Sequence, residues 1–303
     1  MSGRVAVYTT VFPAIKRFLP AWYESILRQT DRDFDLFIGC DAISPDEVRT
    51  LLGRSFDANW CIAPPGSTPT LVREVAIQMI LKMDSHESVI FVDADDVLHP
   101  TRVEAARGVI ENSDVAGCGL EIINEDGSST GTLFGPRSSD PNFDELLPRC
   151  NFFGMSNTAY RTSVLSRCLP LPAECPIMDW FLVTRAWALG SSLAYDPVAR
   201  MYYRQYSSNL ARVLPPFSAA YIRHITAALL SHYRYVLAVV PELKRASRIV
   251  FESAQHRVLK FQQQVTNDET NLNRYLNALN ALPPSVTWWT SVARPELEEM
   301  WNN

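Results

Sequence analysis

Three aspartates that directly follow an apolar run are the first residues in this chain that could do chemistry. Residues 89–92 are apolar without alternation, which predicts a strand covered on both faces. Asp93, Asp95 and Asp96 follow at once. Because carboxylates are rarely buried unless they are paired or bound to a metal, the chain should reach the surface at Asp93. Ligands of open α/β sheets bind at that edge, so Asp93-Ala94-Asp95 predicts carboxylates that hold a divalent cation against a diphosphate.

The same acids also have a purely structural interpretation. Residues 97–106 contain Pro100 and predict a helix with this proline in its first turn. Acids just before a helix often cap it and interact favourably with its dipole. This stretch alone leaves both interpretations open, and Asp96 fits a cap as well as a ligand.

Length and composition restrict the class of protein. The chain has 303 residues, enough for a large α/β domain with an appendage or for two domains. It is 47% hydrophobic and 20% charged, which is ordinary for a globular protein. The net charge of -5 argues against a general nucleic-acid binder, so we expect no nucleic-acid partner.

Cysteine usage and hydropathy indicate the compartment. The six cysteines are scattered and favour buried, reduced thiols, and a Cys168–Cys175 disulfide is the alternative in a secreted protein. The first residues do not match a signal peptide. No apolar run approaches the ~20 residues that would span a bilayer. We therefore expect a cytoplasmic protein.

Strand-like and helix-like runs alternate over the first 120 residues, which predicts a largely parallel sheet with right-handed crossovers. Thr9 lies near the end of the first expected strand, and Asp41 directly follows the second. Neither GxGxxG nor GxxxxGK[ST] occurs, so no dinucleotide or P-loop site is indicated. The expected strands fall at 4–10, 34–40, 60–63, 88–93, 114–123 and 130–134, and the expected helices begin near Pro20, Pro45, Pro69 and Pro100.

The second half changes character near residue 214. Before that point we expect a strand over 152–161, a helix over 178–189 and strands over 192–195 and 199–206. After it we expect three helices and a Trp288-Trp289 tail. We therefore predict an α/β domain over 1–214 and a helical extension over 215–303. The extension could pack on the α/β domain, lie on a membrane surface or form a homodimer.

Five segments add a resemblance that covers about the first 210 residues. They contain a helix with a Gln29-Thr30 turn, an Arg73 helix, the aspartates, a helix that begins Asp179-Trp180, and a closing Tyr-Arg-Gln-Tyr segment. In this order they resemble the family 2 glycosyltransferases of the GT-A fold. The resemblance implies a Rossmann-like, mostly parallel mixed sheet flanked by helices. The segments are 23–38, 73–77, 90–96, 179–190 and 203–209.

The resemblance also implies an activity. Such enzymes transfer a sugar with inversion from a nucleotide diphosphate, UDP by default, to a hydroxyl of a saccharide or lipid-linked saccharide. Asp179 would be the general base, and Asp95 with Asp93 would hold Mn²⁺ or Mg²⁺. Apart from the resemblance, sugar rings pack on aromatic rings, so Trp180 and Phe153 are candidate acceptor contacts, and the alternative is that both belong to the core. Attachment to the inner face of the membrane is an alternative to a fully cytoplasmic location. The expected contacts with the donor are Thr9, Asp41, Arg73, Asp93, Ala94, Asp95 and Arg204.

Four positions depart from the family pattern, and the loss of the histidine, the asparagine and the Gly-Ser loop supports a second interpretation. Residues 40–44 replace the usual D-D-G-S loop, and Glu74 stands where asparagine is usual. Met178 replaces the first acid of an acidic pair, and Tyr206 replaces a histidine that some members place near the metal. The alternative is a catalytically degenerate GT-A domain that binds a nucleotide or a partner. A nucleotidyltransferase is a third interpretation, but the chain lacks a glycine-rich N-terminal loop.

Overall fold

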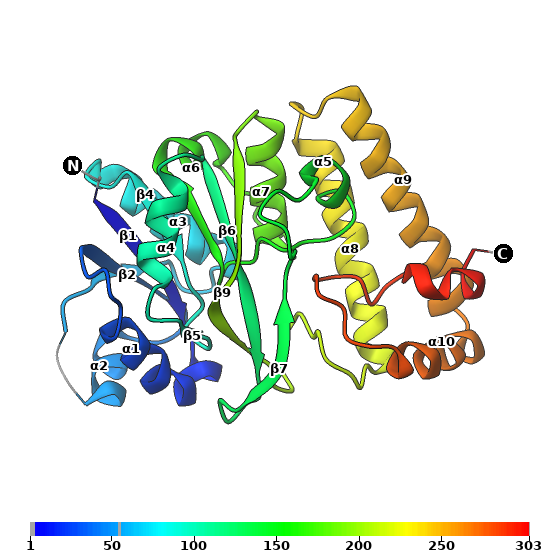
Figure 1. Cartoon of the computed structure of the whole chain (residues 1–303), viewed down its shortest axis with the longest axis horizontal. Helices are drawn as coiled ribbons and strands as arrows, with labels where there is room; N and C mark the ends of the chain where they lie inside the picture. The colour runs from blue at the N-terminus through cyan, green and yellow to red at the C-terminus, as the bar shows by residue number, and fades with distance from the viewer. Residues whose placement is uncertain (1–3, 54–55, 303) are drawn as a thin grey trace.

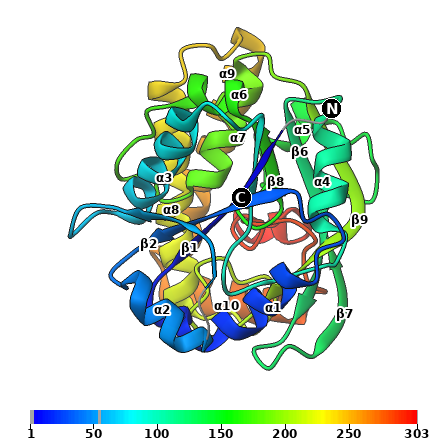
Figure 2. The same ribbon diagram turned by 90° about the vertical axis from the view of Figure 1, so that its left-hand side faces the viewer.

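The computed structural model describes residues 4–53 and 56–302 (Figure 1). Within these ranges one nine-stranded sheet has the order β3-β2-β1-β4-β8-β6-β9-β5, and β7 pairs with β6. Helices cover both faces of the sheet (Figure 2). The strands are β1 (Val5–Val11), β2 (Phe34–Cys40), β3 (Asn59–Ile62), β4 (Ser88–Phe91), β5 (Val97–Leu98), β6 (Val115–Ile123), β7 (Ser129–Phe134), β8 (Thr158–Arg161) and β9 (Leu193–Arg204).

In the first half of the chain, helices alternate with strands as the sequence pattern predicts. Three long helices follow β9. The longer helices are α1 (Leu19–Leu27), α2 (Pro45–Leu52), α3 (Pro69–Met83), α4 (Arg102–Ile110), α7 (Met178–Ala188), α8 (Ala219–Val239), α9 (Arg245–Phe261) and α10 (Glu269–Ala281). The short ones are η1 (Pro13–Phe18), α5 (Phe143–Leu146), α6 (Thr162–Cys168), η2 (Gln262–Thr266) and η3 (Pro295–Met300).

The N-terminal half forms the predicted parallel sheet. β1 pairs in parallel with β2 and with β4, and β2 pairs in parallel with β3. Every residue of β1 and β4 is buried, because helices cover both faces of these strands. Thr68 caps α3, since its hydroxyl accepts a hydrogen bond from the Leu71 backbone N–H at 3.2 Å. The α/β fold class predicted from the sequence is confirmed.

The segment after the aspartates differs from the expected helix. Val97–Leu98 forms the short strand β5, which pairs antiparallel with β9, and α4 begins only at Arg102. The His99 backbone N–H extends this ladder by donating to the Arg200 carbonyl at 3.0 Å. The residue before a proline favours extended backbone, so His99 continues the strand and Pro100 does not begin the helix.

Two other strand predictions need correction. β9 is continuous where two strands were expected, because register shifts at Cys118 and Gly119 accommodate Pro197 within the pairing with β6. The strand expected over 152–161 begins only at Thr158. The residues before it form a buried loop held by Asn157. Its side chain accepts from the Gly154 N–H at 2.7 Å and donates to the Phe152 carbonyl at 3.0 Å.

The C-terminal helices pack together beside the sheet, at the end away from β2 and α2 (Figure 1). α8 packs on α7, where His232 stacks on Trp180 with ring centroids 4.0 Å apart. The chain then returns from α10 to the sheet. There Trp288 forms an isolated bridge with Asn151, and the Gly135 N–H donates to the Val286 carbonyl at 2.7 Å. None of the described helices is both long enough and apolar enough to span a membrane.

Candidate active site

A cleft of about 630 Å³ opens at the carboxyl ends of the parallel strands. Segments that follow β1, β4 and β9 line it, together with the N-terminal ends of α3 and α7 and one residue after α10. This is the edge of the sheet at which α/β proteins bind ligands. The residues that could bind or react there are Arg73, Asp93, Asp95, Asp179, Tyr206 and Trp289.

The acidic cluster divides into two open carboxylates and one structural carboxylate. Asp93, Asp95 and Asp96 each offer an oxygen within 4.8 Å of the others. Asp96 is buried, and its Oδ1 accepts a hydrogen bond from the Arg204 backbone N–H at 2.7 Å. It therefore fastens the turn after β4 to the end of β9. Asp93 and Asp95 are half-buried and line the cleft.

The charges in this cluster are only partly balanced. Burial and the neighbouring Asp95 carboxylate raise the pKa of Asp93 to about 7. Burial also raises the pKa of Asp95, although a hydrogen bond from Tyr206 opposes the shift. One guanidinium balances part of this charge, because Arg73 Nη2 lies 3.8 Å from Asp93 Oδ1. Two carboxylates held together in a partly buried cleft favour a cation between them.

Asp179 lies in the first turn of α7 and lines the same cleft. Its Oδ1 accepts a hydrogen bond from the Trp180 backbone N–H at 2.7 Å, so it also serves the helix terminus. Burial raises its pKa to about 6. A carboxylate with a pKa near neutrality is suited to general-base catalysis, because it is ionised at pH 7 yet basic enough to accept a proton.

Tyr206 occupies the place where the family pattern has histidine. Its hydroxyl donates to Asp95 Oδ2 at 2.6 Å, and its ring packs on Phe18 with centroids 4.9 Å apart. Burial and the Asp95 charge raise the pKa of Tyr206, so the phenol stays protonated and remains a donor. One oxygen of Asp95 is thus engaged. Asp95 Oδ1 and the Asp93 carboxylate remain as hard oxygen donors, a set that fits Mn²⁺ or Mg²⁺.

Arg204 does not line the cleft, contrary to the prediction from the sequence. We predicted a contact with the diphosphate, but the side chain is buried and lies outside the residues that line the cleft. Its Nε donates to the Asp95 carbonyl at 2.8 Å and its Nη1 to the Glu125 carbonyl at 2.8 Å. Its guanidinium also stacks 4.8 Å from the Phe18 ring centroid. Arg204 therefore positions the aspartate turn from behind.

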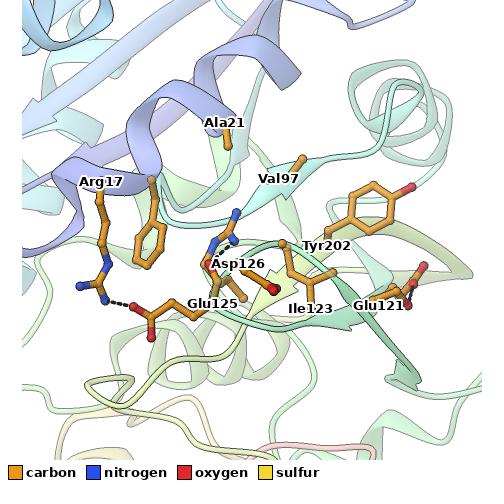
Figure 3. Close-up of a pocket in the computed structure, with 12 residues that line it drawn as sticks. Arg17, Ala21, Val97, Glu121, Ile123, Glu125, Asp126 and Tyr202 are labelled. Carbon is orange, nitrogen blue, oxygen red and sulfur yellow. Dashed lines mark hydrogen bonds and ion pairs between the residues drawn. The ribbon is translucent and has the colours of Figure 1, made fainter.

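Arg204 instead lines a second cavity of about 710 Å³, which Figure 3 shows. An ion pair between Arg17 and Glu125 (2.7 Å) crosses its wall, and Ala21 and Ile123 contribute apolar side chains. Its lining does not include the aspartates of the cleft. The acidic residues of this cavity are Glu121, Glu125 and Asp126, whereas Asp93, Asp95 and Asp179 line the first cleft together.

Trp180 and Phe153 cannot contact an acceptor in this structure, which corrects that prediction. Trp180 is fully buried against His232, and its Nε1 donates to the Leu147 carbonyl at 2.8 Å. Phe153 is fully buried beside Phe152, with ring centroids 4.8 Å apart. Both residues belong to the core.

The remaining donor contacts predicted from the sequence, Thr9, Ala94 and Asp41, differ in their burial. Thr9 and Ala94 are 1% exposed and do not line the cleft, which corrects their prediction as direct contacts. Asp41 is half-buried and directly follows β2, next to the end of β1, because its N–H donates to the Val11 carbonyl at 2.9 Å. It lies outside the cleft lining but on the same edge of the sheet, and its contact with the nucleoside stays a prediction.

Sequence reasoning missed Trp289 as a cleft residue. The residue comes from the segment after α10, about 110 positions beyond Asp179, yet it lines the same cleft. The only signal in the sequence was the Trp288-Trp289 pair. Nothing local connected this pair to the aspartates.

The sheet order and the helices on both faces are those of the GT-A fold. Solved structures agree. The chain is similar to S. aureus TarS residues 1–349 in complex with UDP-GlcNAc, with a TM-score of 0.58 and 16% identity over 92% of this chain and 82% of that chain. The complex of the same protein with UDP has a TM-score of 0.57 and 15% identity over 91% of this chain and 79% of that chain.

A third similar structure is the mannosyltransferase PcManGT from Pyrobaculum calidifontis in complex with GDP-Man and Mn²⁺. It has a TM-score of 0.53 and 13% identity, and the alignment covers 100% of this chain and 88% of that chain. No protein-family model and no curated protein sequence matches the chain. At these identities the likeness establishes the fold.

Proposed function

We propose that the protein is an inverting glycosyltransferase that moves a sugar from a nucleotide diphosphate to a hydroxyl of a saccharide or glycoconjugate acceptor. The observation that carries this proposal is the convergence of Asp93 and Asp95 with Asp179 in one cleft of a GT-A fold. These residues come from two different elements, the turn after β4 and the first turn of α7. The solved structures that share the fold include TarS complexes with UDP and UDP-GlcNAc and a mannosyltransferase complex with GDP-Man, which supports a nucleotide-sugar donor.

Each side chain then has a specific task. Asp179 accepts the proton of the acceptor hydroxyl while that oxygen forms a bond to the anomeric carbon. The bond between the anomeric carbon and the diphosphate oxygen breaks on the opposite face, through an oxocarbenium-like transition state. Asp93 and Asp95 would hold a divalent metal, which when bound neutralises charge on the leaving diphosphate. Arg73, 3.8 Å from Asp93, adds a fixed positive charge at the same place.

The donor and the location remain parts of this proposal. UDP is the default nucleotide, and the GDP-Man complex makes GDP-mannose the second donor to test. We assign catalysis to residues 1–214 and treat 215–303 as a helical extension, whose described residues pack beside the sheet. Val239 and Ile249 of that extension are 40% and 56% exposed. These side chains motivate a membrane-surface or homodimer contact for a protein that acts on lipid-linked saccharides.

The test is release of nucleoside diphosphate from UDP- and GDP-sugars with saccharide acceptors, compared between the wild type and Asp179→Asn. Asp179→Asn should lower transfer by about 10²–10⁴-fold, since a general base contributes that much. Stabilisation by the donor should survive. Asp46→Asn is the matched control, because Asp46 also lies in the first turn of a helix, α2, but does not line the cleft. Full transfer by Asp179→Asn would exclude Asp179 as the base.

A second candidate function is a degenerate GT-A domain that binds a nucleotide without turnover. The hydrogen bond from Tyr206 to Asp95 favours it, since this contact engages an oxygen that a metal could otherwise use. Turnover of any nucleotide sugar, including slow hydrolysis, would exclude this candidate.

A further inference from the structure

The segment that joins α10 to η3, residues 282–294, returns from the C-terminal helices to the sheet; we call it the C-terminal strap. Hydrogen bonds hold it in place on both sides of Trp289, the residue of the strap that lines the cleft. Before that residue, the Trp288 N–H donates to the Asn151 carbonyl at 2.9 Å. After it, the Tyr275 hydroxyl donates to the Ser291 carbonyl at 2.9 Å. The strap is therefore a fixed part of the fold.

Within the strap, Trp288 and Trp289 have different surroundings. Trp288 packs into the core, with its ring centroid 4.7 Å from Phe134 and its ring against Gly154. Trp289 lines the cleft that contains Asp93, Asp95 and Asp179. The first tryptophan thus anchors the strap, and the second faces the candidate active site.

Trp289 also has an unusual backbone and an unused donor. Its φ is +72°, in the left-handed region that bulky residues rarely adopt. Strain of this kind persists where the surroundings fix it and concentrates at ligand sites. The side chain is 8% exposed, and its buried Nε1 has no hydrogen-bond partner among the described residues. Trp22, Trp60 and Trp288 share that last property, but none of them lines the cleft.

We propose that Trp289 forms a wall of the acceptor subsite, where its ring packs on a saccharide ring and its Nε1–H, once the indole turns toward the cleft, donates to a saccharide hydroxyl. The inference rests on the proposed function and names a residue that determines its acceptor specificity. An uncharged aromatic ring with one donor matches a sugar, which offers apolar C–H faces and hydroxyl acceptors. It does not match a diphosphate, whose negative charge Arg73 and a metal held by the aspartates would neutralise.

Part of the cleft lining is free of the predicted nucleotide contacts, which leaves room for an acceptor beside the donor. The lining also includes the exposed residues Ser208 and Leu210 from the segment after β9, and Leu210 is 50% exposed. The cleft therefore opens to solvent beside a segment that carries none of the predicted nucleotide contacts. A second substrate can enter there while the donor occupies the aspartates.

The experiment follows the indole N–H of Trp289 by NMR in the full chain labelled with ¹⁵N-tryptophan. The Trp289→Phe variant assigns the resonance by its loss, and it keeps an aromatic ring at the position. The probes are UDP, GDP, and the methyl glycosides of N-acetylglucosamine, glucose, galactose and mannose. The glycosides are added after the nucleoside diphosphate. Trp60→Phe is the matched control, since Trp60 also has an unpartnered Nε1 but lies outside the cleft.

At least one glycoside should shift the Trp289 resonance and leave that of Trp60 unchanged. Trp289→Phe should weaken that glycoside about tenfold, the effect of one neutral hydrogen bond, and Trp60→Phe should not. Affinity for UDP or GDP should stay unchanged in both variants. Thermal unfolding of each variant checks that the fold is retained.

Three results would overturn the inference. In the first, no glycoside shifts the Trp289 resonance. In the second, a glycoside binds Trp289→Phe as tightly as it binds the wild type. A resonance shifted only by the nucleoside diphosphates would place Trp289 on the donor side and also contradict us. Failure of the proposed function is a separate result, in which neither nucleotides nor nucleotide sugars bind the wild type.

Discussion

The hydrogen bond between Tyr206 and Asp95 allows a quantitative prediction about metal affinity. The Tyr206 hydroxyl lies 2.6 Å from Asp95 Oδ2, so a cation that uses this oxygen must displace or share the donor. A hydrogen bond to a charged group contributes about 1.5–3 kcal/mol. Tyr206→Phe removes this competition. We therefore expect it to tighten Mn²⁺ binding by about 10-fold to 100-fold.

Tyr206→His should tighten binding further, because imidazole is itself a metal ligand. The assay is a calorimetric or EPR titration of Mn²⁺ at pH 8, where the elevated pKa of Asp93, about 7, still leaves the carboxylate mostly ionised. Asp95→Ala should abolish binding at this site. Tyr202→Phe, which removes a phenol outside the cleft, should change nothing. Weaker Mn²⁺ binding in Tyr206→Phe would refute the reasoning, since it would mean that the phenol supports the site.

Three further predictions concern pH and packing. Transfer should lose about tenfold in rate per pH unit below pH 6, because Asp179, whose pKa is raised to about 6, becomes protonated; a pH–rate profile without this limb would contradict its role as base. Burial lowers the pKa of His232 to about 3. Below pH 6.5 only the unfolded state therefore takes up a proton at this residue, and at pH 5 this lowers the free energy of unfolding by about 2 kcal/mol relative to neutral pH. His232→Phe should lose less stability than the wild type between pH 7 and pH 5, as measured by urea unfolding. Equal losses in the wild type and the variant would contradict this prediction. Gly154→Ala would place a Cβ 2.7 Å from the Trp288 ring and should cost about 1–3 kcal/mol in thermal unfolding; Gly108→Ala, with open space around it, is the control and should not destabilise.

The sequence was informative where local pattern decides structure. The alternation of strands and helices over the first 120 residues predicts the parallel sheet, because each element there packs against its neighbours in the chain. Thr68 and Pro69 predict the start of α3 from local capping alone. Asp93, Asp95 and Asp179 reach one cleft because they directly follow or begin core elements at the same edge of the sheet.

Residues whose roles depend on long-range contacts were not predicted correctly. Arg204 lies two residues from Tyr206, yet only the fold shows that its guanidinium binds the Asp95 and Glu125 carbonyls instead of facing the cleft. Trp180 follows the candidate base directly, but α8 covers it with His232. Its burial depends on a helix about 50 residues away, which no local pattern reveals.

Donor binding tests the central claim most directly. Thermal unfolding would be followed with UDP-GlcNAc, other UDP-sugars, GDP-mannose, or the nucleotides alone, each with Mn²⁺ or EDTA, for the wild type and for Asp95→Ala. A donor at 100 times its Kd adds about 2.7 kcal/mol to the stability of the folded state. We predict a higher midpoint with one nucleotide class, reduced by EDTA and lost in Asp95→Ala. No rise with any donor, or an equal rise in Asp95→Ala, would contradict the claim that this cleft binds a nucleotide sugar through its aspartates.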